Sequence, residues 1–238
     1  MAEQRHSRQR TLENPEIEKL KERLRHHRDQ LKRLHRKGTG GLELVRRNAE
    51  FYDEIIRSLF RKAVQDYSGT EIPLAVAAVG GYGSKLLAPY SDIDLLFLVG
   101  EGSDPETARS LIEATLYPLW DMKLEVGHAT RAVSDQAYLL LHDPAVLTAS
   151  LDARFLAGDR STFDELLHLM NAYIDSGRIK PRIPRKTEPG MEDYPIASVT
   201  VLEPNVKESP GGLRDLQALD WALQVQSGCA DPGAVAGR

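Results

Sequence analysis

Cysteine, long apolar runs and aromatic side chains are scarce in this chain of 238 residues. The one cysteine, Cys229, excludes an internal disulfide framework and favours a reducing compartment. No apolar run approaches the roughly 20 residues that a membrane-spanning helix needs, and the first residues are too polar for a secretory signal. We therefore expect a soluble protein of the cytoplasm with no membrane partner.

The composition is otherwise that of a globular protein. Hydrophobic residues make up 41% of the chain and charged residues 28%, which is too apolar for a disordered polypeptide. Because a domain usually has roughly 100–200 residues, we expect one domain of catalytic size and a smaller appendage.

Charge is distributed unevenly along the chain. Residues 1–40 hold 12 basic and 6 acidic residues, whereas the whole chain has 31 basic and 35 acidic ones and a net charge of −4. The basic segment has helical spacing, with an apolar stripe formed by Ile17, Leu20, Leu24, Leu31 and Leu34. A basic helix suits nucleic acid or an acidic partner, but the leucine stripe favours a solvated helix that packs by its apolar side. Nucleic acid is therefore not expected as a partner.

Apolar periodicity predicts an alternation of helices and strands. Two helices are expected first, one ending before Gly38 and one ending at Ser68. Strands are expected at 74–79, 93–99, 124–133 and 151–156, and helices at 105–120, 144–148, 163–174 and 213–226. The four prolines between residues 177 and 195 predict a loop or linker.

Two aspartates mark the start of the second expected strand. Asp92 and Asp94 alternate along this strand, so their side chains are expected on the same face. Carboxylates this close repel each other unless a cation lies between them, and their oxygen atoms suit Mg²⁺. An isolated Asp-x-Asp is nevertheless more often a pair of solvent-facing acids, so the pair alone does not define a site.

A pair of glycines follows the first expected strand. Gly80 and Gly81 expose backbone N–H groups at a tight turn, which can hold phosphate oxygens. A dinucleotide fingerprint is excluded because it needs glycine where Leu86 stands, and the Gly-Ser-Lys of residues 83–85 is not a P-loop. A glycine turn after one strand, with ten residues before paired aspartates on the next, predicts a nucleotidyltransferase. The turn would bind the triphosphate, and the aspartates would hold metal at the α-phosphorus.

This arrangement resembles the DNA polymerase β-like nucleotidyltransferase superfamily. Four blocks in chain order are similar to the PII uridylyltransferase family: GGYGSKLLAPYSDIDLLFL, LYPLWDMKLEVGHATR, SLDARFLAGD and LEPNVKESPGGLRDLQALDW. The resemblance covers roughly residues 44–226, and its last block is the most specific. It implies an α+β fold, in which a polymerase β-like nucleotidyltransferase domain with a mixed sheet is flanked by helices.

The resemblance also implies a domain organisation. Residues 1–68 would form an N-terminal helical region, residues 69–205 the nucleotidyltransferase domain, and residues 206–238 the start of a truncated helical domain. The family normally continues into a phosphohydrolase domain and two glutamine-sensing domains, so we expect this chain to be a fragment or a truncated homologue.

The implied reaction is transfer of UMP from UTP to a tyrosine of the PII nitrogen-regulatory protein, with release of pyrophosphate and with Mg²⁺ as cofactor. UTP and the PII signalling protein are thus the expected partners. Two alternatives remain open. One is an adenylyltransferase of the same superfamily, and the other is a catalytically idle regulatory module that only binds a partner.

The resemblance assigns roles to further residues. A third metal-binding and catalytic carboxylate is expected at Asp152, next to Asp92 and Asp94, although Asp152 could instead be an ion-pair partner of Arg154. Glu125 is the competing third ligand.

The nucleotide-binding residues are expected at Gly80, Gly81, Ser84, Lys85 and Ser91. Family members commonly carry an arginine after the glycine turn, where this chain has Ser84-Lys85. Lys85 would substitute as a point charge without the bidentate geometry of arginine.

Overall fold

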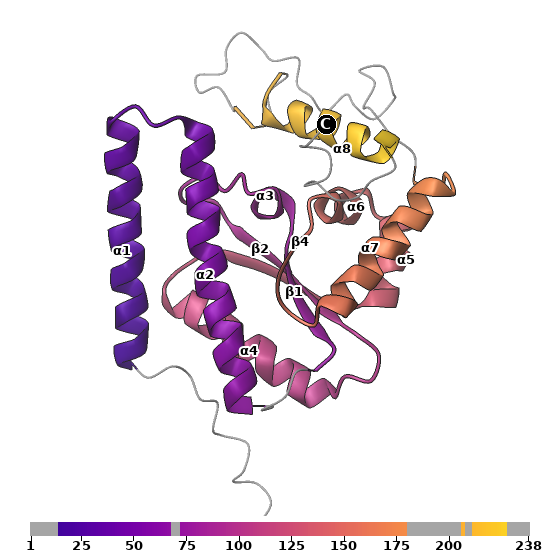
Figure 1. Ribbon diagram of the computed structural model, residues 1–238, viewed down its shortest axis with the longest axis horizontal. Coiled ribbons are helices and arrows are strands. Elements are labelled where there is room, and N and C mark those ends of the chain that lie inside the picture. The colour runs from indigo at the N-terminus through magenta and orange to yellow at the C-terminus, as the bar shows by residue number, and fades with distance from the viewer. Residues whose placement is uncertain (1–13, 68–71, 180–205, 208–210, 228–238) are drawn as a thin grey trace, which may run out of the picture. The chain divides into compact units, whose positions relative to one another are not determined.

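The computed structural model describes residues 14–67, 72–179, 206–207 and 211–227 (Figure 1). The chain divides into two compact units, residues 1–168 and residues 169–238. The expected domain boundaries at 68 and 205, and most of the linker expected at 177–195, lie outside the described residues.

The first unit begins with two long helices that lie side by side, α1 (Asn14–Arg36) and α2 (Gly41–Tyr67) (Figure 1). The predicted apolar stripe of α1 is confirmed, because Ile17, Leu24 and Leu31 are each buried to about 5% exposure or less. The turn between the helices passes through Gly38, whose φ of +86° is a conformation that suits glycine.

A four-stranded mixed sheet follows, in the order β3-β2-β1-β4. Its strands are β1 (Leu74–Ala78), β2 (Ile93–Val99), β3 (Val126–Ala132) and β4 (Arg154–Gly158). β1 is antiparallel to both β2 and β4, whereas β2 is parallel to β3. The expected α+β fold with a mixed sheet flanked by helices is confirmed, and it is consistent with a nucleotidyltransferase-like domain.

One face of the sheet carries the main core. α2 and α4 (Pro105–Asp121) lie across this face (Figure 1). Ile93, Leu95 and Phe97 of β2 pack there with apolar residues of both helices. Because side chains alternate along a strand, Asp94 belongs to the opposite face.

Four elements differ clearly from the sequence expectations. The single-turn helix α3 (Gly80–Gly83) and α5 (Val133–His142) were not expected, and α6 (Pro144–Leu151) is longer than the predicted 144–148. The strand expected at 151–156 is wrong at its start, since Leu151 still belongs to α6 and β4 begins only at Arg154. Asp143 caps α6 by accepting hydrogen bonds from Ala145 N and Val146 N, and Pro144 suits the first turn. These two features start a helix that runs to Leu151.

The helix α7 (Arg160–Asp175) follows β4, and the described part of the second unit contains α8 (Leu213–Ser227), close to the predicted 213–226. Within the described residues, every helix is too short or too polar to traverse a lipid bilayer.

Candidate active site

The glycine turn forms directly at the end of β1. Gly83 N donates to Val79 O and Ser84 N donates to Gly80 O, each at 3.1 Å, which closes one helical turn. Gly80 enters this turn with φ at +57°, a left-handed conformation that glycine adopts without strain. Gly81 has an ordinary φ, and a Cβ placed on it would meet no atom within 4 Å. Both glycines are partly exposed, so the beginning of the turn is accessible.

Gly83 packs the turn against the segment that carries Asp152. A Cβ on Gly83 would overlap the backbone carbonyl oxygen of Asp152 and would lie 2.9 Å from Ala78 O. Only a residue without a side chain allows this approach, because a backbone carbonyl cannot move aside as a flexible side chain can. The family-like Gly-Gly-Tyr-Gly segment therefore needs its last glycine for packing.

We expect Gly83→Ala to lower the free energy of unfolding by about 1–3 kcal/mol, since the added methyl forces the backbone of the turn or of Asp152 to shift. Urea denaturation measures this change. Gly40→Ala is the matched control, because a Cβ on Gly40 meets no atom within 4 Å. Equal stability of the two variants would contradict the close packing at Gly83.

Asp94 lies beside the glycine turn. Val79 N donates to the backbone oxygen of Asp94 at 3.1 Å, and Asp94 pairs with Gly127 on β3. A Cβ on Gly80 would lie 3.7 Å from Asp94 Oδ2, and one on Gly127 would overlap Asp94 Oδ1. Glycines on both neighbouring segments therefore leave room around this half-buried carboxylate.

Asp92 is exposed and precedes β2, and strand alternation places it on the same side as Asp94. Glu125 lies level with Asp92, because Ile93 N donates to Glu125 O at 2.9 Å and Ile93 pairs with Val126. Since Val126 packs against the core, Glu125 belongs to the face that carries Asp94. The competing third ligand is thus on the same side of the sheet as the aspartate pair.

Asp152 ends α6 and is only 5% exposed. Within residues 14–67, 72–179, 206–207 and 211–227, no three His, Cys, Asp or Glu side chains are grouped so as to hold a metal ion. The donor chemistry of the aspartate pair suits Mg²⁺, and Gly80 and Gly127 place no side chain of their own against the Asp94 carboxylate. The role of Asp152 as a third ligand stays a prediction.

The remaining predicted nucleotide-binding residues surround the turn and the loop after it. Ser84 Oγ donates to Gly81 O at 3.1 Å, so this hydroxyl contacts the turn itself. Lys85 is half-buried with φ at +61°, and Ser91 is exposed immediately before Asp92. Asn48 of α2 holds the intervening loop by donating to Leu87 O at 3.0 Å.

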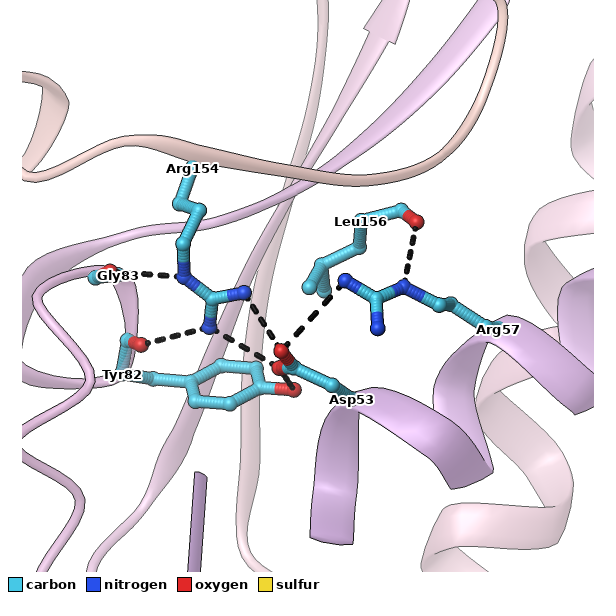
Figure 2. A network of polar contacts seen from close by, with 6 residues as sticks. All are labelled: Asp53, Arg57, Tyr82, Gly83, Arg154 and Leu156. Atoms are coloured by element: carbon cyan, nitrogen blue, oxygen red, sulfur yellow. Dashed lines mark hydrogen bonds and ion pairs between the residues drawn. The ribbon is translucent and has the colours of Figure 1, made fainter. Parts of the chain in front are cut away.

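A buried polar network behind the turn was not expected from the sequence (Figure 2). Arg154 pairs with Asp53 of α2 through two hydrogen bonds, Nη1 to Oδ2 at 2.6 Å and Nη2 to Oδ1 at 3.0 Å. The Tyr82 hydroxyl donates to Asp53 Oδ1 at 2.8 Å. Burial, and then the neighbouring Asp53 carboxylate, hold the pKa of Tyr82 well above its usual 10, so this phenol stays a donor.

Two comparisons identify relatives of the chain. A family model described as GlnD PII-uridylyltransferase matches residues 185–238. The bifunctional uridylyltransferase/uridylyl-removing enzyme of Gluconobacter oxydans (strain 621H) is 39% identical over 199 residues, which are 80% of this chain and 20% of that enzyme. The enzyme of the same name from Nitrobacter winogradskyi is 42% identical over 176 residues, 71% of this chain and 19% of that enzyme.

The chain therefore spans about a fifth of the length of the curated relatives that it matches. The matches cover most of this chain at about 40% identity, and they confirm the family resemblance of its sequence blocks. The chain belongs to the PII uridylyltransferase family, whose curated members are named bifunctional uridylyltransferase/uridylyl-removing enzymes.

Proposed function

We propose that this chain transfers UMP from UTP to a tyrosine hydroxyl of the PII signalling protein and releases pyrophosphate. The observation that supports this most directly is the position of the Gly80 turn beside the Asp94 carboxylate, at the ends of two paired strands. Nucleotidyl transfer from a triphosphate requires a turn that binds phosphate and, next to it, acidic residues that hold a cation. The names of the relatives supply the choice of uridylyl transfer.

The glycine turn would bind the triphosphate, and the aspartates would hold the cation. Gly80 and Gly81 would hold the triphosphate through backbone N–H groups, with Ser84, Lys85 and Ser91 as further contacts around the turn. Asp92 and Asp94 would hold Mg²⁺ together with Asp152, and the bound cation would neutralise charge that develops on the triphosphate. In the reaction the tyrosine oxygen would bond to the α-phosphorus, and the bond from the α-phosphorus to the oxygen that bridges it to the β-phosphorus would break. Pyrophosphate would leave with that oxygen, and the phenolic proton would pass to solvent.

The choice of nucleotide and acceptor can be tested directly. The purified chain is incubated with Mg²⁺, PII and each of the four α-labelled nucleoside triphosphates in turn. We expect label on PII from UTP only, and loss of labelling when the acceptor tyrosine is changed to phenylalanine. Labelling from ATP would instead favour an adenylyltransferase. Binding of PII without labelling from any nucleotide would favour the idle regulatory module.

Gly81→Val tests the phosphate-binding role of the turn. The protein leaves open space at Gly81 and its φ is ordinary, so the variant should fold, while the valine side chain occupies the space that phosphate oxygens need. We expect the affinity for UTP with Mg²⁺ to fall at least tenfold in calorimetry. Gly41→Val, in the equally open first turn of α2, is the control for introducing valine. Unchanged UTP affinity in Gly81→Val would leave the glycines as an ordinary turn.

A further inference from the structure

Arg154 connects the glycine turn to a distant helix. Its guanidinium donates from Nε to Gly83 O at 3.0 Å and from Nη2 to Tyr82 O at 3.3 Å. The same group donates to both carboxylate oxygens of Asp53 on α2. One side chain therefore bonds to two consecutive carbonyls of the turn and to a carboxylate 101 residues away in the sequence (Figure 2).

These bonds orient the turn. The carbonyls of Tyr82 and Gly83 lie at the C-terminal end of α3, where no further helical turn follows, and Tyr82 O also accepts from Lys85 N at 3.2 Å. Because Arg154 binds these carbonyls, the end of the turn is held toward α2. The beginning of the turn at Gly80 then lies on the side of Asp94, where its Cβ position is 3.7 Å from Oδ2.

The Asp53 carboxylate is buried and is contacted by two arginines and a tyrosine. The side chain of Asp53 is 4% exposed and that of Arg154 is 20% exposed. The Tyr82 hydroxyl also donates to Asp53, and Arg57 Nη2 lies 3.6 Å from Asp53 Oδ2. A planar fork with several fixed donors can satisfy a carboxylate and two carbonyls together, whereas an ammonium group cannot match this geometry.

We infer that Asp53 and Arg154 are positioning residues for the nucleotide: they hold the Gly80–Gly83 turn in its phosphate-binding orientation without touching substrate. This inference rests on the proposed function, since it concerns the same binding turn. Arg154 also begins β4 two residues after Asp152, and the Asp152 carbonyl packs on Gly83. The pair thus fixes the turn relative to the segment of the third predicted carboxylate as well.

A neighbouring arginine offers a matched control. Arg57 lies near the same carboxylate, but its Nε donates to Leu156 O of β4 at 3.0 Å and not to the turn. Arg57→Lys and Arg154→Lys therefore remove the same kind of group beside Asp53 and keep its positive charge. Only the second change removes bonds to the glycine turn.

The experiment compares these two variants with the unchanged chain. We expect Arg154→Lys to weaken binding of UTP with Mg²⁺ at least tenfold in calorimetry, and Arg57→Lys to change it less than twofold. Without nucleotide, amides of residues 80–86 should exchange hydrogen at least tenfold faster in Arg154→Lys, while those of α4 keep their rate. Faster exchange confined to the turn separates positioning from general loss of stability.

The outcomes distinguish the inference from the proposed function. If the unchanged chain binds UTP and Arg154→Lys binds it equally well, the positioning role is wrong and the proposed function stands. Equal losses of affinity in Arg57→Lys and Arg154→Lys would also overturn it, because stability alone would then explain both. If the unchanged chain binds no nucleoside triphosphate, the proposed function fails and the positioning role fails with it.

Discussion

Asp94→Asn should slow nucleotidyl transfer roughly a thousandfold. The substitution keeps the size of the side chain and removes one negative charge beside the glycine turn. Electrostatic stabilisation at a metal-assisted centre is worth several kcal/mol, and a loss of ~4 kcal/mol corresponds to roughly a thousandfold in rate. The measurement is Mg²⁺-dependent release of pyrophosphate from UTP with PII as the acceptor.

The stability of Asp94→Asn should fall little or even rise, because the variant loses a like-charge repulsion with Asp92. A thermal melt alongside the rate measurement therefore separates a catalytic defect from unfolding. Near-normal turnover of a folded Asp94→Asn variant would reduce the aspartate pair to surface acids and remove the basis of the proposed activity.

The same assay decides which carboxylate is the third. We expect Asp152→Asn to be as slow as Asp94→Asn and Glu125→Gln to be nearly unchanged. Glu125 is nevertheless level with Asp92 and on the face of the sheet that carries Asp94. If Glu125→Gln is the inactive variant and Asp152→Asn is not, the third ligand is Glu125, immediately before β3, and the rest of the site assignment is kept.

The sequence predicts the parts of this site that depend on local pattern. Period-two alternation places Asp92 and Asp94 on one face, and a glycine pair after an apolar run predicts a turn. The two motifs lie side by side because β1 and β2 pair antiparallel, so the end of one strand lies beside the start of the other. Strands that follow each other in the sequence are usually neighbours in a sheet, which makes such pairing the common case.

Boundaries were predicted less well than elements. Residues 133–142 do carry helical spacing, since Val133, Ala137 and Leu140 are buried at intervals of four and three residues. This short pattern follows β3 without a break, so the sequence predicts a strand that continues to Val133, where the structure already begins α5. At residue 151 the apolar run predicts a strand, but Asp143 and Pro144 start a helix that includes Leu151.

The network around Arg154 could not be predicted from the sequence. Its residues lie on α2, in the glycine turn and on β4, and no local period connects Asp53 with Arg154. The sequence offers Asp152 as an ion-pair partner of Arg154, and an aspartate is the right type of residue. In the structure, however, Arg154 makes a bidentate bond to Asp53. Long-range pairs of this kind depend on the tertiary fold.

Asp53→Asn should destabilise the first unit strongly while it leaves the predicted site residues intact. Breaking a buried ion pair by removing one charge costs about 3–5 kcal/mol, and we expect the lower figure because Arg154 is one-fifth exposed. For a chain of this size, ~3 kcal/mol corresponds to a fall in Tm of roughly 6–12 °C. Circular dichroism during heating measures it.

Glu43→Gln is the control on the same helix. Glu43 accepts from Arg47 Nη2 at 2.6 Å, but both side chains are about half exposed, and such surface pairs contribute about 0–1 kcal/mol. A fall in Tm as large in Glu43→Gln as in Asp53→Asn would show that burial of the pair has no special effect.

The double variant Asp53→Leu with Arg154→Met separates stability from positioning. Replacing both partners of a buried pair by apolar side chains of similar volume is often nearly neutral, so Tm should recover much of what Asp53→Asn loses. UTP affinity should stay low, because methionine cannot donate to the carbonyls of Tyr82 and Gly83. Recovery of UTP affinity together with Tm would mean that the ion pair only stabilises the fold, and that the glycine turn keeps its orientation without Arg154.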